Sequence, residues 1–166
     1  MFALLKNYAN SVDLVFNPRA FQLGFEPAAL GAIRRIFPAA EIKECNFHFG
    51  QSLWRKAQQL GLSRFYHDVE IRRFLRACGA LALIPLGAID DAWMDMNEDA
   101  IDPDHPAYMA LEAFKEYFVN TWLENENFPR ALWNHYRNFG PRTTNHLEGW
   151  HNGLNILIRK KHVNIF

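Results

Sequence analysis

The fold is decided by residues 20–45, which read AFQLGFEPAALGAIRRIFPAAEIKEC. The first six of these residues alternate in character and predict a short strand. Pro27 then opens a helix, at a position where the missing N–H of proline costs nothing because a first-turn N–H has no helical partner. This helix ends before Pro38 and carries one apolar face, formed by Leu30, Ile33, Ile36 and Phe37. Residues 41–45 predict a second short strand.

Helical spacing dominates the rest of the chain. Apolar residues predict a short helix over 2–10 and a longer one over 46–60, with Gly61 as its end. The same spacing predicts helices over 65–83, 86–97, 106–123, 129–138 and 145–159, and leaves 97–106 as an acidic loop. Five residues are expected to anchor the packing of these helices: Trp54, Trp93, Trp122, Trp133 and Trp150.

We therefore expect a helix-rich α/β fold with about two short strands and about seven helices. Two lone strands cannot form a stable sheet by themselves. Either the strands pair with each other and lean on the helices, or the rest of their sheet is missing. We favour the second explanation.

The composition predicts a folded chain. Of its 166 residues, 49% are hydrophobic and 22% are charged, which allows a real core and argues against disorder. The net charge is zero, whereas a free-standing DNA-binding domain usually carries a basic excess. Cys45 and Cys78 are too few for a disulfide framework and indicate a reducing compartment. The start of the chain lacks a signal-peptide pattern, and Pro85 breaks the longest apolar stretch, 77–89, so we expect an intracellular protein without a membrane partner.

Three stretches carry a resemblance to a known family. They are Phe25-Glu26 with the helix that follows to Pro38, CNFHFGQSLWRK at 45–56, and PRTTNHLEGWH at 141–151 followed by Asn155 and by HVNI at 162–165. In this order and spacing they resemble the transposase domain of Mutator-like elements, the MULE domain, which has an RNase H-like fold. The matching family segments are Asp-Phe-Glu, the Cys-x-x-His helix and Arg-Thr-Asn…Glu-x-x-His.

The resemblance covers almost the whole chain but only the later part of the family's domain. It implies one partial transposase domain over residues 1–166. Residues 1–62 would be an RNase H-like remnant, 63–138 a large all-helical insertion, and 139–166 the C-terminal part with the glutamate helix. We expect that last helix to pack back against the strands.

Family members cut and join DNA with an Asp-Asp-Glu set that holds two Mg²⁺ ions. The resemblance places the first aspartate on a strand that precedes this chain, the second at Gly24 and the third at Glu148. Glycine supplies no ligand, and neither Asp13 nor Glu26 replaces the missing aspartates. We therefore expect no catalysis, no metal site and no cofactor in this chain.

The remaining motif residues also have structural explanations. Asn145 and Glu148 match a capping box, so Glu148 is expected to be a catalytic remnant that mainly caps its helix. Cys45 and His48 have the spacing of half a zinc site, but structural zinc needs four ligands and no second pair follows. We favour a buried thiol and a hydrogen-bonded first-turn histidine, and the resemblance implies that this pair supports the floor of the active site.

Two further groups of residues lie on or beside the last expected helix. His151, part of the family motif, and Asn155 share a helix face with Glu148 and either line a cleft or form an ordinary polar face. A small basic group could contact DNA phosphates: Arg142, Arg159, Lys160 and Lys161. Because the net charge is zero, we favour the explanation that these residues complement the helix dipole.

The expected function is that of a truncated, catalytically inactive Mutator-like transposase fragment, nuclear by resemblance. Its ancestral activity would be Mg²⁺-dependent DNA strand cleavage and transfer. Three alternatives stay open: a domesticated DNA-binding or protein-interaction module, an active transposase completed by sequence missing here, and a gene fragment without a stable product. Binding of DNA by this chain alone is expected to be weak.

Overall fold

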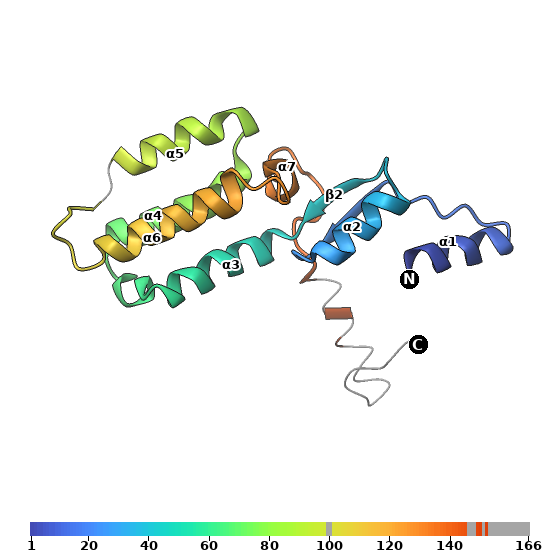
Figure 1. The fold of residues 1–166 in the computed structure, drawn as a ribbon, viewed down its shortest axis with the longest axis horizontal. Helices are drawn as coiled ribbons and strands as arrows, with labels where there is room; N and C mark the ends of the chain where they lie inside the picture. Colours follow the sequence, from blue (N-terminus) through green and yellow to red (C-terminus); the bar gives the residue numbers. More distant parts are fainter. Residues whose placement is uncertain (99–100, 146–148, 151, 153–166) are drawn as a thin grey trace.

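The computed structural model describes residues 1–98, 101–145, 149, 150 and 152 (Figure 1). At its centre lies a strand–helix–strand unit made of β1 (Ala20–Leu23), α2 (Pro27–Ile36) and β2 (Glu41–Glu44). The two strands pair in parallel, with Ala20 opposite Glu41 and Leu23 opposite Glu44. Both predicted strands and the helix between them are confirmed, and the described part of the chain is a helix-rich α/β fold.

Aromatic side chains attach α1 (Phe2–Ser11) and the end of α2 to one face of this sheet. The ring of Phe21 in β1 lies 5.7 Å from the ring of Phe2 and 5.3 Å from that of Phe37. The ring of Phe16 also lies 5.7 Å from that of Phe37. Because side chains alternate along a strand, Leu23 shares this face with Phe21.

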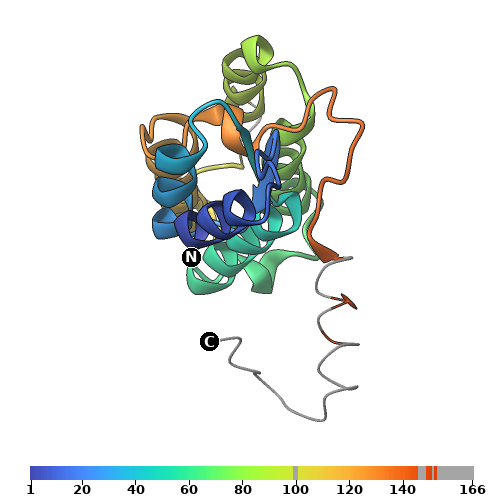
Figure 2. The same cartoon turned by 90° about the vertical axis from the view of Figure 1, so that its right-hand side faces the viewer.

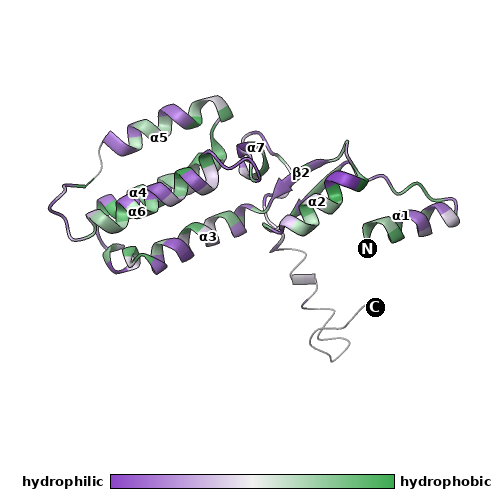
Figure 3. Ribbon diagram, viewed as in Figure 1, coloured by the Kyte–Doolittle hydropathy of each residue, from purple (hydrophilic) through white to green (hydrophobic). Residues whose placement is uncertain are grey.

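A layer of helices follows β2. It consists of α3 (Asn46–Gln59), α4 (Val69–Ala80), α5 (Ile89–Glu98) and α6 (Tyr108–Phe118), with α4 and α6 between the other two in Figures 1 and 2. Short 3-10 turns lie between α3, α4 and α5: η1 (Leu62–Phe65), η2 (Leu81–Leu83) and η3 (Leu86–Ala88). The π-helical η4 (Val119–Leu123) continues directly from the end of α6. Apolar and polar residues alternate around these helices, as expected for amphipathic helices (Figure 3).

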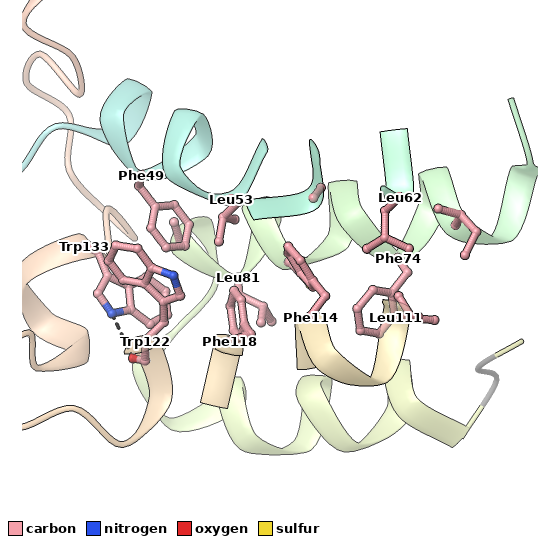
Figure 4. Close-up of a cluster of buried hydrophobic side chains, with 14 of the residues drawn as sticks. Phe49, Leu53, Leu62, Phe74, Leu81, Leu111, Phe114, Phe118, Trp122 and Trp133 are labelled. Carbon is pink, nitrogen blue, oxygen red and sulfur yellow. Dashed lines mark hydrogen bonds between the residues drawn. The ribbon is translucent and has the colours of Figure 1, made fainter. Parts of the chain in front are cut away.

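The main core lies between α3, α4 and α6 (Figure 4). The apolar stripe predicted on α3 is buried there at Phe49, Leu53 and Ala57. Phe49 stacks on Trp133 with ring centroids 5.0 Å apart, and the indole N–H of Trp133 donates to the Trp122 carbonyl at 3.1 Å. This contact joins α3 to the segment that leads back to the sheet.

Some predicted helix boundaries are wrong. The helix expected over 65–83 begins at Val69, because the Asp68 carboxylate accepts a hydrogen bond from the Glu70 N–H at 2.8 Å and caps the helix there. The helix expected over 129–138 is only α7 (Arg130–Trp133). It ends because Asn134 and His135, which follow it, hydrogen-bond carbonyls of η2 (Leu81–Leu83) and the carbonyl of Glu44 in β2. The helix expected over 145–159 lies almost wholly outside the described residues.

The expected anchoring role of tryptophan is confirmed in part. Trp122 and Trp133 are buried, and Trp93 stacks on Phe118 with ring centroids 4.9 Å apart. Trp54 is 39% exposed, and its ring packs edge-on against that of Tyr66 with centroids 5.1 Å apart, whereas Trp150 is 61% exposed and is not part of the core. None of the helices in the described ranges is long and apolar enough to cross a membrane.

Candidate functional site

The motif residues that the structure describes meet where β1 and β2 end and α3 begins. Gly24 follows β1 directly, Cys45 follows β2, and His48 lies in the first turn of α3. Parallel strands bring their carboxyl ends to the same sheet edge, which is the usual place for a site in an α/β fold. The structure therefore brings the first two sequence motifs together.

Gly24 faces the imidazole of His48. A Cβ atom added at Gly24 would lie 3.5 Å from Nδ1 and 3.7 Å from Cε1 of His48, which is ordinary van der Waals contact. Of the described glycines, only Gly61 has a positive φ, so the backbone at Gly24 does not demand glycine. Position 24 thus has a backbone conformation that other residues can adopt and enough space for a side chain.

Cys45 connects the second motif to the third. Its fully buried thiol accepts hydrogen bonds from the main-chain N–H and the hydroxyl of Thr144, at 3.3 and 3.5 Å. The neighbouring Asn46 N–H donates to the Arg142 carbonyl at 2.8 Å. The prediction of a buried thiol is confirmed, and the hydrogen bonds to it hold the 142–144 segment at the start of α3.

His48 is half-buried beside these contacts. Its carbonyl accepts a hydrogen bond from the Ser52 hydroxyl at 3.0 Å, and the same hydroxyl also lies 2.8 Å from the Phe49 carbonyl. These are the bonds that a serine within a helix commonly makes to the carbonyls three and four residues before it.

The divalent ions implied by the resemblance do not fit the described residues. Position 24 is glycine and offers no ligand atom. Within residues 1–98 and 101–145, no group of three or more His, Cys, Asp or Glu side chains could hold a metal ion. No catalytic step through a metal is therefore derived for this chain.

Glu44, which the sequence analysis did not single out, is buried at the same sheet end. It is 0% exposed, and neither carboxyl oxygen has a hydrogen-bond partner among the described residues. The pKa of Glu44 is raised to about 7, chiefly by burial and also by the nearby carboxylate of Glu26, while the Arg34 guanidinium acts in the opposite direction. The signal was present in the sequence, because period-two alternation puts Glu44 on the same face as Ile42.

His135, also missed, closes the outer edge of β2. Its Nε2 lies 2.8 Å from the Glu44 carbonyl oxygen, which can only accept, so Nε2 carries the proton. Its Nδ1 then accepts from the Asn138 amide at 3.0 Å. The pKa of His135 is lowered, chiefly by burial, and this agrees with a neutral imidazole ring. No local pattern predicts this role, because it depends on a contact between distant segments.

Lys43, whose side chain lies on the other face of β2, also contacts the segment that covers this edge. Its ammonium group donates to the carbonyls of Ala131 and Asn134 at 2.9 and 3.1 Å. These carbonyls lie at the end of α7, so the lysine also holds the chain where that helix stops. The outer edge of β2 is thus covered by side-chain contacts.

Of the remaining predicted site residues, Arg142 reaches this cluster through its main chain, since its carbonyl accepts from the Asn46 N–H at 2.8 Å. Arg142 is exposed, and its Nε donates to the Asn138 carbonyl at 3.3 Å. The others lie outside the described residues: Glu148, His151, Asn155, Arg159, Lys160 and Lys161. Their predicted roles as catalytic remnant, motif residues and DNA contacts stay predictions.

Comparison of the chain with protein-family models, with curated proteins and with solved structures found no match.

Proposed function

We propose that this chain is a transposase-derived protein of the Mutator-like type, of RNase H-like ancestry, that no longer cleaves or joins DNA. The observation that carries the proposal is the geometry at Gly24. The position ends a strand, faces His48 and has room for a side chain, yet it supplies no ligand. Two-metal phosphodiester chemistry needs clustered carboxylates, and the described ranges contain no such cluster.

The contacts between the three sequence motifs support this proposal. Cys45 of the second motif holds Thr144 of the third, and Gly24 at the start of the first lies against His48. An α/β unit with a parallel strand pair is compatible with an RNase H-like sheet. If an ancestral enzyme lost its catalytic activity but not its fold, we would expect the contacts between the motifs to remain while a metal ligand is missing, and this chain has both features.

A strand-cleavage assay tests the proposal. The chain and a Glu148→Ala variant are incubated with supercoiled plasmid DNA and either Mg²⁺ or Mn²⁺, and the nicked and linear forms are quantified. We expect the two proteins to give the same background. Metal-dependent nicking by the natural chain that disappears in Glu148→Ala would refute the proposed inactivity.

A second candidate function, a domesticated protein-interaction module, is favoured by exposed apolar surface at the start of the chain. Large apolar side chains are exposed there at Met1, Leu4, Leu5, Tyr8, Val12, Leu14 and Val15. Contiguous exposed apolar patches are typical of interaction sites. Zero net charge argues against DNA as the main partner.

Binding measurements separate the protein-interaction module from the DNA-binding one. Fluorescence anisotropy with a labelled duplex should show no sequence-specific binding by the chain alone, at low or at physiological salt. Tight, sequence-specific binding to a terminal inverted repeat would favour the DNA-binding module instead. We also propose a nuclear location, which microscopy of a tagged chain tests directly.

A further inference from the structure

A groove of about 410 Å³ lies on the face of the sheet opposite α2. Phe21 and Leu23 point toward the α2 face, so the alternating side chains of Gln22 and Lys43 point to the opposite face and line the groove. Residues between 136 and 141, in the segment that follows α7, also line it. A volume of this size is typical of sites for small ligands.

The segment that follows α7 is held in shape by its own hydrogen bonds. The Asn138 side-chain oxygen accepts from the Gly140 N–H at 3.0 Å, and the Asn138 amide donates to His135 at 3.0 Å. The Tyr136 N–H donates to the Asn134 side chain at 3.1 Å. A groove with a wall formed in advance orders fewer groups when a ligand binds, which favours affinity.

The groove contains hydrogen-bond donors that the described residues leave unused. The side-chain Nε2 of Gln22 is buried and has no hydrogen-bond partner among them. The Lys43 ammonium group has three donors, of which two go to the carbonyls of Ala131 and Asn134, at 2.9 and 3.1 Å. The Glu41 carboxylate oxygen lies 3.8 Å from this ammonium group, beyond hydrogen-bond distance. An acceptor in the groove would therefore find open donors on both strands.

Arg137 adds a cation on a strained backbone. Its φ of 57° lies in the left-handed region, which costs free energy for any residue with a side chain. Its guanidinium lies 5.4 Å from the centre of the Tyr136 ring, and it takes part in none of the ion pairs among the described residues. Because glycine would adopt this backbone more easily, a use for the side chain is the simplest reason for arginine here.

We propose that this groove binds a small phosphate ester, about the size of a mononucleotide, through its phosphate group. Gln22, Lys43 and Arg137 supply donors for the three terminal oxygens, and a guanidinium can bind two of them at once. Two cations outnumber the one carboxylate of Glu41 in the groove, which suits a group that carries about two negative charges near pH 7. The proposal goes beyond the lost chemistry and does not depend on it.

Three arguments favour this ligand over other occupants. Further strands of the sheet would join at the edge of β1 and not on this face. After residue 145 the sequence has one carboxylate, Glu148, against the three cations of 159–161, so that stretch has the same sign of charge as the groove. A carboxylate ligand has two oxygens and one charge, and would leave one of the three donor side chains unmatched.

Isothermal titration calorimetry of the natural chain with AMP and with ribose 5-phosphate tests the proposal. Both esters should bind, whereas adenosine, succinate and inorganic phosphate should each bind about tenfold more weakly or not at all. Absence of binding by both esters at millimolar concentration would overturn the proposal. So would adenosine binding as tightly as AMP, or succinate or inorganic phosphate binding as tightly as ribose 5-phosphate.

Two substitutions separate a binding role from a structural one. Gln22→Met keeps the length of the side chain but removes the unpaired donor, and Arg137→Gly removes the cation and relieves the backbone. Each should weaken AMP binding by about tenfold or more. Each should also leave the melting temperature unchanged or higher, whereas loss of a structural contact would lower it.

Two matched controls lie outside the groove. Asp13→Gly relieves a similar backbone, with φ of 54°, and Arg64→Gln removes one exposed positive charge in η1, at the end of α3 far from the sheet (Figure 1). Both should bind AMP as the natural chain does. Unchanged AMP affinity in folded Gln22→Met and Arg137→Gly, or an equal loss in Arg64→Gln, would contradict a phosphate site in this groove.

Discussion

The thiol of Cys45 accepts a hydrogen bond from the main-chain N–H of Thr144, 3.3 Å away, although the two residues are 99 positions apart in the chain. This bond connects the end of β2 to the segment just before the glutamate motif. The Thr144 hydroxyl approaches the same sulfur at 3.5 Å. Cys45, which has the spacing of half a zinc site with His48, is therefore an acceptor that positions a distant part of the chain.

Replacing Cys45 should release this segment. Cys45→Ala removes a buried acceptor and its volume, so we expect the free energy of unfolding to fall by about 2 kcal/mol and the Thr144 amide to exchange its hydrogen faster. Denaturant titration and hydrogen exchange measure the two effects. Cys78→Ala is the control, because Cys78 is equally buried in the helical core but has no bond to Thr144. Equal exchange rates at Thr144 in both variants would contradict the role given to Cys45.

Gly24 and Gly61 should respond in opposite ways to alanine. Gly24→Ala adds a Cβ in ordinary contact with His48 and restricts the unfolded chain, so stability should stay within about 1 kcal/mol of the natural protein or rise. Gly61→Ala forces a side chain onto a backbone with φ of 79° and should cost about 1 kcal/mol. Thermal denaturation of both variants measures the difference. A loss at Gly24 as large as that at Gly61 would show that glycine is needed there.

Restoring an acid at position 24 should not restore chemistry. Gly24→Asp should fold, because the position tolerates a Cβ, but the aspartate that the resemblance places first in the family's set is still absent from residues 1–166, so the three carboxylates that hold two metal ions are not complete. The supercoiled-plasmid assay should therefore give the same background for Gly24→Asp as for the natural chain. Metal-dependent nicking by this variant would mean that position 24 is the only ligand the site lacks.

The sheet could be predicted from the sequence because its signals are local. Pro27 starts α2, Pro38 follows its end, and two short alternating runs flank the helix, so β1, α2 and β2 needed no knowledge of the rest of the chain. The early end of α7 could not be predicted in this way. The His135 N–H donates to the Ala82 carbonyl at 2.6 Å, and its ring donates to Glu44, so distant contacts override a local helical pattern.

The candidate site shows the same division. Its motif positions, Gly24, Cys45 and His48, each follow the end of a predicted strand, but the sequence left open whether the two strands pair with each other, so their proximity required the fold. The burial of Glu44 was visible in the alternation of β2 but contradicts the rule that carboxylates stay exposed. The contact between Cys45 and Thr144 required the fold, because nothing in the spacing of these residues connects them.

Glu44 should make the protein less stable as pH rises. The pKa of Glu44 is about 7 in the folded state, against an ordinary value of 4.5, so the folded state binds this proton more tightly than the unfolded state. The stabilisation that results is complete below pH 4.5 and is lost as the pH rises to 7. Glu44→Gln should therefore be more stable than the natural chain above pH 7, by about 3 kcal/mol at most, and this gain should shrink toward pH 4.5.

Denaturation over a pH series measures this effect, with Glu41→Gln as the control. Glu41 lies on the same strand but is exposed, so its replacement should leave the pH dependence nearly unchanged. A stability difference between Glu44→Gln and the natural chain that is the same at every pH would show that the Glu44 carboxyl does not titrate in this range.

His135 should make the protein less stable on the acid side. Burial lowers its pKa below 6.5, so the unfolded state binds the proton more readily, and the stabilisation present above 6.5 is lost as pH falls through the folded-state pKa. His135→Gln cannot take up this proton, so its stability should fall less on acidification, although it should lose about 1–3 kcal/mol at neutral pH with the contacts to Glu44 and Asn138. Equilibrium denaturation at a series of pH values below and above 6.5 measures the effect. The control is His67→Gln, because His67 is exposed. Parallel pH curves for the natural chain, His135→Gln and His67→Gln would contradict a neutral, buried His135 at the edge of β2.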